Sequence, residues 1–388
     1  MRTSINVTFH YGNATLHVKS IRKRKKIEKV MKTKRLKNLP NLENGEKPLR
    51  LEQDFARYIG CSYSIAVNSY TAALHLALDA IGLKEGGEVI TSPFTLPPTA
   101  AVITYFKAVP IFIDCNLDTF NIDPDKIEEH ITHKTRAIIP VHHAGHPCDM
   151  ERIMEIAMHY RLHVIGDASH ALPSRYKGKM VGTIGDITCF GFYPLNNPLE
   201  SIGGMIATEN EKFAERIKMM RQHGINRNLR YEIRYPGYEY MLPDIYASIG
   251  IHQLKRCDDL HRKRNNIAMI YNAAFKEIPE IKTPHVDSEV QHSWHLYIIL
   301  LDLDRLKINR DEFIKTLTAK NIDAFIHCMP LHIHPYYRDT YGYILEDFPN
   351  AMKLYESAIS LPIHPTMSEK DVSNVIDAVI ETVTETKD

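Results

Sequence analysis

The chain has 388 residues, of which 44% are hydrophobic and 24% are charged, and its net charge is +1 at pH 7. This length suffices for a large core and two or three domains. The near-zero charge gives no whole-molecule attraction to nucleic acid, which we do not expect as a partner. No apolar run reaches the roughly 18 residues needed to span a bilayer, and the N-terminus lacks a signal-peptide pattern. We therefore expect a cytoplasmic protein without membrane association.

The six cysteines form no CxxC pair, and several lie in apolar, strand-like runs, which favours buried and reduced thiols. Histidines are numerous, and they recur in the runs "HVIGDASH" and "FIHCMPLHIHPYY". No HxxxH or HExxH pair falls on a clear helix, where that spacing would place two imidazoles on one face. We expect no metal site.

Residues 1–40 differ from the rest of the chain. The run "IRKRKKIEKVMKTKRLK" at 21–37 is strongly basic, and its apolar residues form an imperfect helical stripe. Two interpretations stay open: a helix docked by its thin apolar edge, or a cationic patch for nucleic acid or another anionic surface. We treat 1–40 as an atypical basic N-terminal segment.

From residue 50 to about 235, helical stretches alternate with short apolar strands. Strands rich in β-branched residues between helices predict a mainly parallel sheet buried on both faces, and sites in such sheets gather at the strands' C-terminal ends. Residues 236–265 are expected to form a loop and then a long helix. We predict a large domain at 41–265 and a smaller α+β domain at 266–388. The predicted strands are "YSIAVNS", "EVITSPFT", "VPIFIDC", "RAIIPVHHAG", "HVIGDAS", "ITCFGFY" and "GGMIATE".

Nine motifs follow one another from about residue 48 to 385, namely "VNSYTAALHLAL", "EVITSPFT", "TRAIIPVHHAGHPCDM", "GDASHA", "MRQHGINR", "GYEYMLPDIYASIGIHQLKR", "SWHLYIILL", "PLHIHPYYR" and "AISLPIHPTMSEKDV". With these motifs in this order, the chain resembles the DegT/StrS-type nucleotide-sugar aminotransferases. The resemblance implies an α/β, fold-type I aminotransferase fold with a mainly parallel, seven-stranded-type sheet. It also implies pyridoxal phosphate (PLP) or pyridoxamine phosphate (PMP) as cofactor, a keto-sugar on a nucleoside diphosphate (NDP) as substrate, and a homodimer with active sites at the interface.

Part of the expected cofactor site is retained. Ser69, Thr71 and Ala72 open a helix directly after a strand, where backbone N–H groups suit a phosphate. They equally suit a simple helix cap. Asp167 matches the carboxylate that keeps the pyridine nitrogen protonated, although a turn or cap aspartate would look the same. His170 matches a residue near the cofactor's ring oxygen in relatives.

Other positions of the same site depart from the family pattern. Leu96 stands where relatives carry an aromatic that stacks on the ring, and Gly191 replaces a serine that contacts the phosphate. Glu239 stands where relatives place a neutral or cationic group, and a carboxylate beside a phosphate is repulsive. Asn196 takes the place of the Schiff-base lysine, and its amide nitrogen is not a nucleophilic amine.

The substrate-side residues are inferred from the resemblance alone. His223 and Arg227 in "RQHGINR" match positions that contact the sugar nucleotide or the neighbouring subunit in relatives. Tyr336, Tyr337 and Arg338 in "HPYYR" do the same. Cationic and aromatic groups suit a diphosphate and a sugar face, while a solvated or interface role is the other interpretation for each.

These changes affect different functions of the cofactor site, namely ring stacking, phosphate binding and Schiff-base formation. We therefore expect a family member that does not carry out standard transamination and serves as a nucleotide-sugar-binding protein or a partner subunit. It would form a homodimer or a hetero-oligomer with an active homologue. The alternative is an active PLP- or PMP-dependent NDP-sugar aminotransferase or 3-dehydratase, with His170 or another histidine as base. A third interpretation is an aminotransferase in which the lysine has been mutated to Asn196.

Overall fold

The computed structural model describes residues 7–11, 14–18, 45–192, 202–226, 232–233 and 235–387. The basic run at 21–37, Asn196 and Arg227 lie outside the described residues. The chain divides into two units, residues 1–45 and residues 46–388. In the first unit, two strands pair antiparallel, β1 (Val7–Tyr11) and β2 (Ala14–Val18).

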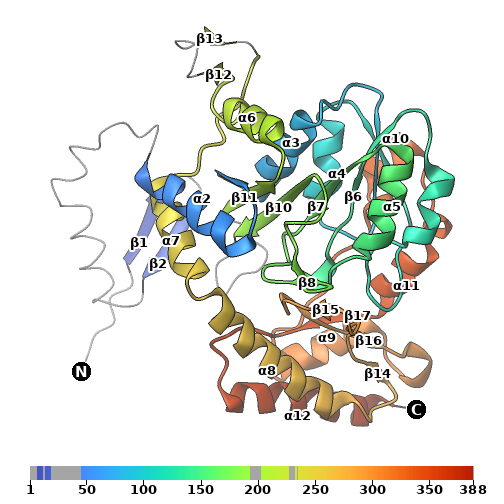
Figure 1. The fold of residues 1–388 in the computed structure, drawn as a ribbon. Coiled ribbons are helices and arrows are strands. Elements are labelled where there is room, and N and C mark those ends of the chain that lie inside the picture. The colour runs from blue at the N-terminus through green and yellow to red at the C-terminus, as the bar shows by residue number, and fades with distance from the viewer. Residues whose placement is uncertain are drawn as a thin grey trace. The chain divides into compact units, whose positions relative to one another are not determined.

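A seven-stranded sheet organises the second unit (Figure 1). The strands from β5 to β10 run parallel, and β11 is antiparallel to both of its neighbours. The predicted α/β fold with a mainly parallel sheet is therefore confirmed. In spatial order the strands are β5 (Val109–Phe112), β4 (Glu88–Thr91), β6 (Thr135–Ile139), β7 (His163–Asp167), β10 (Ile187–Phe192), β11 (Gly203–Thr208) and β3 (Tyr63–Val67).

The helices begin and end at recognisable sequence signals. Helix α2 ends before Gly60, whose φ of 85° lies in the left-handed region that glycine adopts freely. The Asn210 side chain caps α6, and Ser368 and Asp371 form a capping box at α12. The helices are α2 (Glu46–Ile59), α3 (Tyr70–Ala80), α4 (Pro97–Thr104), α5 (Met150–Tyr160), α6 (Glu211–Met220), α7 (Asp244–Leu254), α8 (Cys257–Phe275), α9 (Arg310–Ala319), α10 (Pro335–Tyr341), α11 (Pro349–Ser357) and α12 (Glu369–Thr386).

Helices cover both faces of the seven-stranded sheet. On β10, Ile187 and Cys189 belong to one apolar cluster, which also contains side chains of α3 and α6. Phe190 and Phe192 belong to a second cluster, which contains side chains of α2 and α7. Because successive strand residues point to opposite faces, the two clusters are the two sides of a doubly covered sheet. This explains why its strands are apolar almost throughout.

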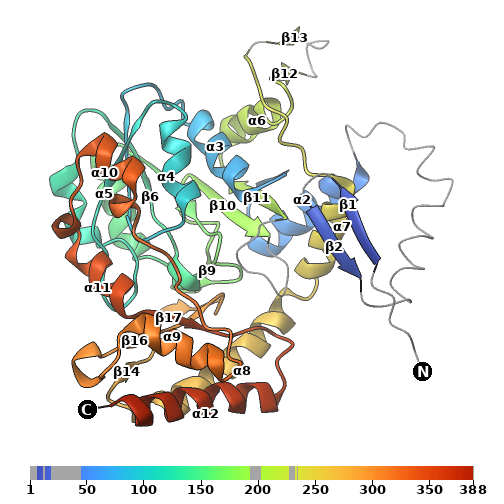
Figure 2. The same ribbon diagram turned by 180° about the vertical axis from the view of Figure 1, so that it is seen from behind.

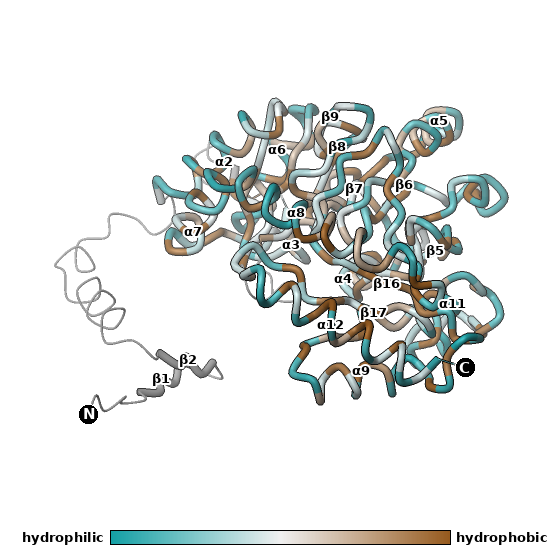
Figure 3. The backbone as a smooth tube through the Cα atoms, turned by 90° about the horizontal axis from the view of Figure 1, so that it is seen from below, coloured by the Kyte–Doolittle hydropathy of each residue, from teal (hydrophilic) through white to brown (hydrophobic). Residues whose placement is uncertain are grey.

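A smaller antiparallel sheet, in the order β14-β16-β17, packs against α8, α9 and α12 (Figure 2). Hydrophobic and hydrophilic residues alternate along α12 (Figure 3), as expected of a helix with one buried face. The predicted α+β character of the C-terminal part is confirmed. The remaining strands are β14 (Ile281–Lys282), β16 (Tyr297–Leu301), β17 (Ala358–Leu361), β8 (Arg175–Tyr176), β9 (Lys179–Met180), β15 (Val290–Gln291), β12 (Ile225–Asn226) and β13 (Glu232–Ile233).

The long helix expected after residue 236 is in fact two helices. Helix α7 and helix α8 are separated at Lys255 and Arg256. Helix α8 then continues to Phe275, across the boundary predicted between residues 265 and 266, and its Tyr271 and Phe275 are part of the C-terminal apolar cluster. The division at that boundary stays a prediction.

All six cysteines are free thiols. Four of them are buried, namely Cys115, Cys148, Cys189 and Cys257. In the part of the chain that the structure describes, no helix is both long enough and apolar enough to cross a membrane.

A buried ion pair joins α2 to the end of α6 beside the edge strand β3. The Nη1 of Arg221 lies 2.5 Å from Oε1 of Glu52 and also donates to the carbonyl of Ala66 at 2.7 Å. The same Glu52 oxygen accepts from the backbone N–H of Ala66 at 2.9 Å. Glu52 and Arg221 are 7% and 8% exposed, so removing one partner leaves the other charge buried.

We predict that Glu52→Ala lowers the free energy of unfolding by about 3–5 kcal/mol, because Arg221 keeps its charge without a partner. Denaturant unfolding followed by circular dichroism measures this. Glu85→Ala is the matched control, since Glu85 and its partner Lys107 are 72% and 75% exposed, and it should leave stability unchanged. A loss for Glu52→Ala no larger than that of the control would contradict the assignment.

Candidate functional site

The site forms where strands of the large sheet end. Asp167 is the last residue of β7, and its side chain is 1% exposed. Gly191 lies on the neighbouring strand β10, and helix α3 begins at Tyr70, shortly after the end of β3. Ends of parallel strands are where α/β folds place their ligands, and the prediction located the site at this edge.

Asp167 is fully hydrogen-bonded by groups of its own chain. Its Oδ2 accepts from the phenol of Tyr70, in a very short hydrogen bond, and from Oγ1 of Thr99 at 2.8 Å. Its Oδ1 accepts from the backbone N–H of Ser169 at 3.2 Å and from the Ser169 hydroxyl at 2.8 Å. A carboxylate has about four lone-pair sites, so these donors fill all of them.

Burial dominates the electrostatics of this carboxyl. Burial raises the pKa of Asp167, and the hydrogen bonds from Tyr70, Ser169 and Thr99 oppose that rise without cancelling it. Tyr70 is itself 3% exposed and Thr99 is fully buried. The carboxyl therefore lies in a dry, crowded place, with the Tyr70 ring beside it.

The start of helix α3 is a capped helix N-terminus. Ser69 is its N-cap, and the Ser69 hydroxyl accepts from the backbone N–H of Ala72 at 3.0 Å. Thr71 is half-buried in the first turn. The cap interpretation is thus realised in the structure. Phosphate binding by Ser69, Thr71 and Ala72 stays a prediction.

The two glycines at the start of β11 allow the N-terminus of helix α3 to pack close to this strand. A Cβ on Gly204 would lie 2.6 Å from the backbone carbonyl oxygen of Ser69, which no side chain tolerates. Glycine is required there because two backbones approach each other.

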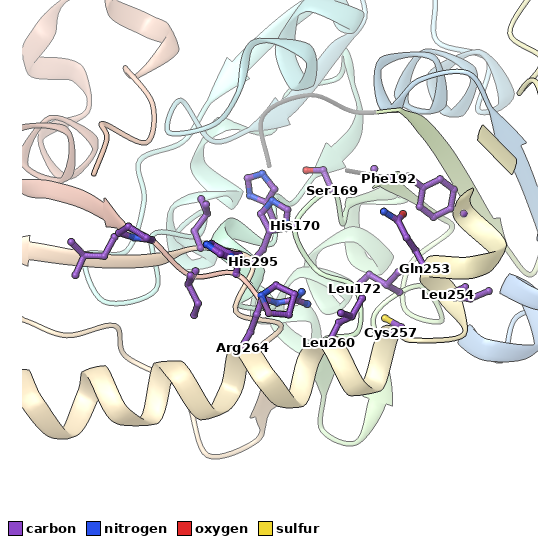
Figure 4. A pocket seen from close by; sticks show the side chains of 18 of the residues that line it. Ser169, His170, Leu172, Phe192, Gln253, Leu254, Cys257, Leu260, Arg264 and His295 are labelled. Atoms are coloured by element: carbon purple, nitrogen blue, oxygen red, sulfur yellow. The ribbon is translucent and has the colours of Figure 1, made fainter. Parts of the chain in front are cut away.

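A cavity of about 340 Å³ opens beside the strand ends. Residues from the large sheet, from α7 and α8, and from the C-terminal part line it together (Figure 4). Its polar lining includes Ser169, His170, Gln253, Arg264 and His295. Gly191 also lines this cavity, while its place beside a cofactor phosphate stays a prediction.

His170 and His295 stack in this cavity. Their ring centroids are 4.3 Å apart and their planes are inclined by only 13°. Burial lowers the pKa of His170 to about 4, so the imidazole is neutral near pH 7. A neutral imidazole keeps one nitrogen as a hydrogen-bond acceptor.

Arg264 brings a positive charge to the cavity from helix α8. Its Nε donates to the carbonyl of Ser293 at 3.2 Å, and burial lowers the pKa of the guanidinium. Arginine stays protonated in proteins in spite of such shifts. Among the described residues, no carboxylate lies within ion-pair distance of this guanidinium. An anionic ligand would supply the missing counter-charge.

Comparison with known proteins agrees with this geometry. The sequence model of the DegT/DnrJ/EryC1/StrS aminotransferase family matches residues 22–380. The chain belongs to this family. It is 48% identical to the uncharacterized protein MJ1066 of Methanocaldococcus jannaschii, over 88% of this chain and 92% of that one. It is 43% identical to the spore coat polysaccharide biosynthesis protein SpsC of Bacillus subtilis, over 87% and 90%.

Solved structures show the same family fold. The crystal structure of DesV from S. venezuelae superimposes with a TM-score of 0.84 at 29% identity, covering 93% of this chain and 95% of DesV. The recognition of the family from ordered motifs is therefore confirmed.

The PLP that an aminotransferase of this family is expected to use meets an obstacle in this chain. PLP acts as an electron sink when its pyridine nitrogen stays protonated on a carboxylate. Asp167 stands at the matching position, but its four acceptor sites are already used by Tyr70, Thr99 and Ser169. As arranged, these donors leave Asp167 no further acceptor site for a ring nitrogen.

The positions that depart from the family pattern differ in their burial and in the residues that they contact. Leu96 is the N-cap residue of α4 and is half-buried. Phe94, two residues before Leu96, packs on His143 with ring centroids 5.1 Å apart. Glu239 is exposed and pairs with Gln222 in an isolated bridge, so within one chain it faces solvent.

The described substrate-side residues lie outside the lining of the cavity. His223 is exposed, in a left-handed backbone conformation with φ of 55°. Tyr337 is 6% exposed and packs against Phe112, while Arg338 pairs with Asp339 at 2.8 Å. Tyr336 is 53% exposed. Contacts of these residues with a sugar nucleotide or another subunit stay predictions.

Four site residues escaped the sequence analysis, namely Tyr70, Thr99, Arg264 and His295. Tyr70 is part of the quoted motif "NSYTAAL", and a bulky phenol at a helix start otherwise suited to phosphate was the available signal. The others carry no local signature, because only the fold brings them to the cavity.

We predict that Tyr70→Phe lowers the free energy of unfolding by about 1.5–3 kcal/mol, since it removes a hydrogen bond to a buried charged group. Tyr105→Phe is the matched control, because Tyr105 is 58% exposed. Urea unfolding of both variants gives the comparison. Equal stabilities of the two variants would show that the Tyr70 hydroxyl does not hold Asp167.

Proposed function

We propose that this chain keeps the family's nucleotide-sugar site but does not carry out standard transamination. The observation that carries the proposal is the filled hydrogen-bond shell of Asp167. A cofactor nitrogen could gain this carboxylate only by displacing Tyr70 from a buried position. Displacing Tyr70 would break a charge-assisted hydrogen bond, and the phenol ring would have to pack elsewhere.

The residue at the lysine position supports the same conclusion. By the motif resemblance, Asn196 stands where the family carries the lysine that forms the Schiff base, and an amide nitrogen cannot form one. Gly191 lacks the hydroxyl that would contact the phosphate, and Leu96 lacks a π-face. Each loss weakens a different cofactor contact, so together they lower affinity in steps of about 1–2 kcal/mol each.

The chemistry of the cavity indicates which ligand it takes. Arg264 is a cation without a carboxylate partner among the described residues, and its planar fork matches the oxygens of a phosphate. Apolar side chains such as Leu172, Leu254 and Leu260 form much of the remaining wall. A diphosphate at Arg264 with a sugar or base against the apolar wall fits this combination. The relative SpsC, named for polysaccharide biosynthesis, makes an NDP-sugar the natural class to test.

Assembly with a second subunit is part of the proposal. Ile245, Tyr246 and Ile249 on α7 are 67%, 43% and 41% exposed. Neighbouring exposed apolar side chains on one helix are typical of a protein–protein interface. We propose a homodimer, or a hetero-oligomer with an active homologue, in the cytoplasm.

One observation favours the alternative function. His170 is neutral near pH 7 and lines the cavity, so it is able to accept a proton. A PLP- or PMP-dependent NDP-sugar aminotransferase or 3-dehydratase would use such a base. This alternative function would also require Tyr70 to move away from Asp167, whereas the proposed binding function would not.

We predict that the wild-type chain, mixed with PLP, shows no Schiff-base absorbance, and that Asn196→Lys alone does not restore it. The double variant Tyr70→Ala with Asn196→Lys restores it, because it supplies the amine and frees the carboxylate. Absorbance spectra and equilibrium dialysis measure the complex.

The control is Tyr70→Ala alone, which should bind PLP only non-covalently. A tight 1:1 complex of the wild-type chain with PLP, together with turnover of an NDP-keto-sugar, would overturn the proposal and favour the alternative.

We also predict that Arg264→Met weakens the binding of uridine diphosphate by about 10- to 100-fold, the value of a hydrogen bond to a charged group. Isothermal titration calorimetry measures the affinity. Arg262→Met is the matched control, because Arg262 lies on the same helix with its side chain 72% exposed. Equal affinities of the two variants would place the diphosphate elsewhere.

A further inference from the structure

A second group of chemically reactive side chains lies behind the cavity. His143 follows strand β6, and His327 and Cys328 belong to the segment that precedes α10. One ligand atom from each of these residues lies within 4.8 Å of the other two. The runs "VHHAG" and "FIHCMP" are far apart in sequence, and the fold brings them together.

The two imidazoles have no hydrogen-bond partner. Both ring nitrogens of His143 and both of His327 are buried and unpaired among the described residues. His143 is 1% exposed and His327 is 6% exposed. A buried imidazole without partners is costly, because each unpaired polar atom loses about 1–3 kcal/mol of solvation. Such groups in a native protein call for an explanation, and a bound ion is one.

The surroundings hold these rings in place. His143 and His327 meet edge to face, with centroids 4.5 Å apart. Phe94 stacks on His143 at 5.1 Å, and Phe120 contacts it at 5.5 Å. A rigid apolar shell around nitrogen and sulfur donors is a common setting for a bound metal.

The geometry points to a Zn²⁺ site formed by His143, His327 and Cys328. Zn²⁺ binds imidazole nitrogen and thiolate sulfur at about 2.0–2.3 Å, so tetrahedral ligand atoms are about 3.3–3.8 Å apart. The ligand atoms lie within 4.8 Å of one another, and they would move closer together to reach that spacing around the ion. The thiol excludes Mg²⁺ and Ca²⁺, which prefer oxygen ligands. Three protein ligands leave the fourth position for water or a small molecule.

The proposed site differs from the metal pattern that was sought in the sequence. That pattern, HxxxH or HExxH, places two histidines on one helix, whereas these ligands come from two separate loops. The ion would join the end of β6 to the C-terminal part of the chain, close to the cavity, because the rings of His327 and His170 are 5.8 Å apart. The two imidazoles lack hydrogen-bonded carboxylates or carbonyls behind them. Since such partners are worth about 10- to 100-fold in affinity, we expect binding weaker than in sites that have them.

The test uses the full chain after dialysis against a chelator, with Co²⁺ as spectroscopic probe and Zn²⁺ as competitor. We expect one equivalent of Co²⁺ to give tetrahedral d–d bands and a sulfur-to-cobalt charge-transfer band, both removed by Zn²⁺. Cys328→Ser loses the charge-transfer band, and His143→Gln weakens binding by at least about 10-fold. The control Cys61→Ser, which removes a half-buried thiol outside the group, keeps both bands.

A wild-type chain without the charge-transfer band, or a band that survives in Cys328→Ser, would overturn the site. Circular dichroism checks the fold of each variant. If Cys328→Ser does not fold, the melting temperature decides: the same Zn²⁺ concentration raises it more in the wild-type chain than in His143→Gln. Equal shifts in these two proteins would also overturn the site.

Discussion

The carboxylate of Asp167 is the point at which the elements of this site meet. It ends strand β7, and its hydrogen bonds hold the first residue of α3, a residue of α4 and the turn after β7. A buried carboxylate must be hydrogen-bonded or neutralised, and in an aminotransferase the cofactor supplies part of that requirement. Here the chain supplies all of it. The phenol of Tyr70 donates a hydrogen bond of the kind that a ring nitrogen would supply, and the proposed function rests on this contact.

The cavity beside Asp167 retains features that a sugar nucleotide would use. The end of the sheet, helices α7 and α8 and the C-terminal part line it, and Arg264 contributes a cation that no described carboxylate neutralises. Family members with this scaffold differ in what they do at the strand ends, since function depends on the site and not on the fold. We propose on this basis that the chain binds a nucleotide sugar and does not transfer an amino group.

The sequence predicted the fold well, because alternating apolar strands and helices with clear caps leave few arrangements. It also placed Asp167, His170 and Gly191 at one edge, since the ends of parallel strands meet there. It missed the role of Tyr70, because a side chain's partner depends on packing between α3, α4 and β7 that no local pattern encodes. The grouping of His143 with His327 escaped for the same reason: the two residues are distant in sequence and follow no helical spacing.

The most direct test of this account is a crystal structure of the full chain grown with excess PLP. The account predicts that the Tyr70 hydroxyl remains on Asp167 and that no pyridine ring lies beside this carboxylate. A ring nitrogen bonded to Asp167, with Tyr70 turned away, would contradict it.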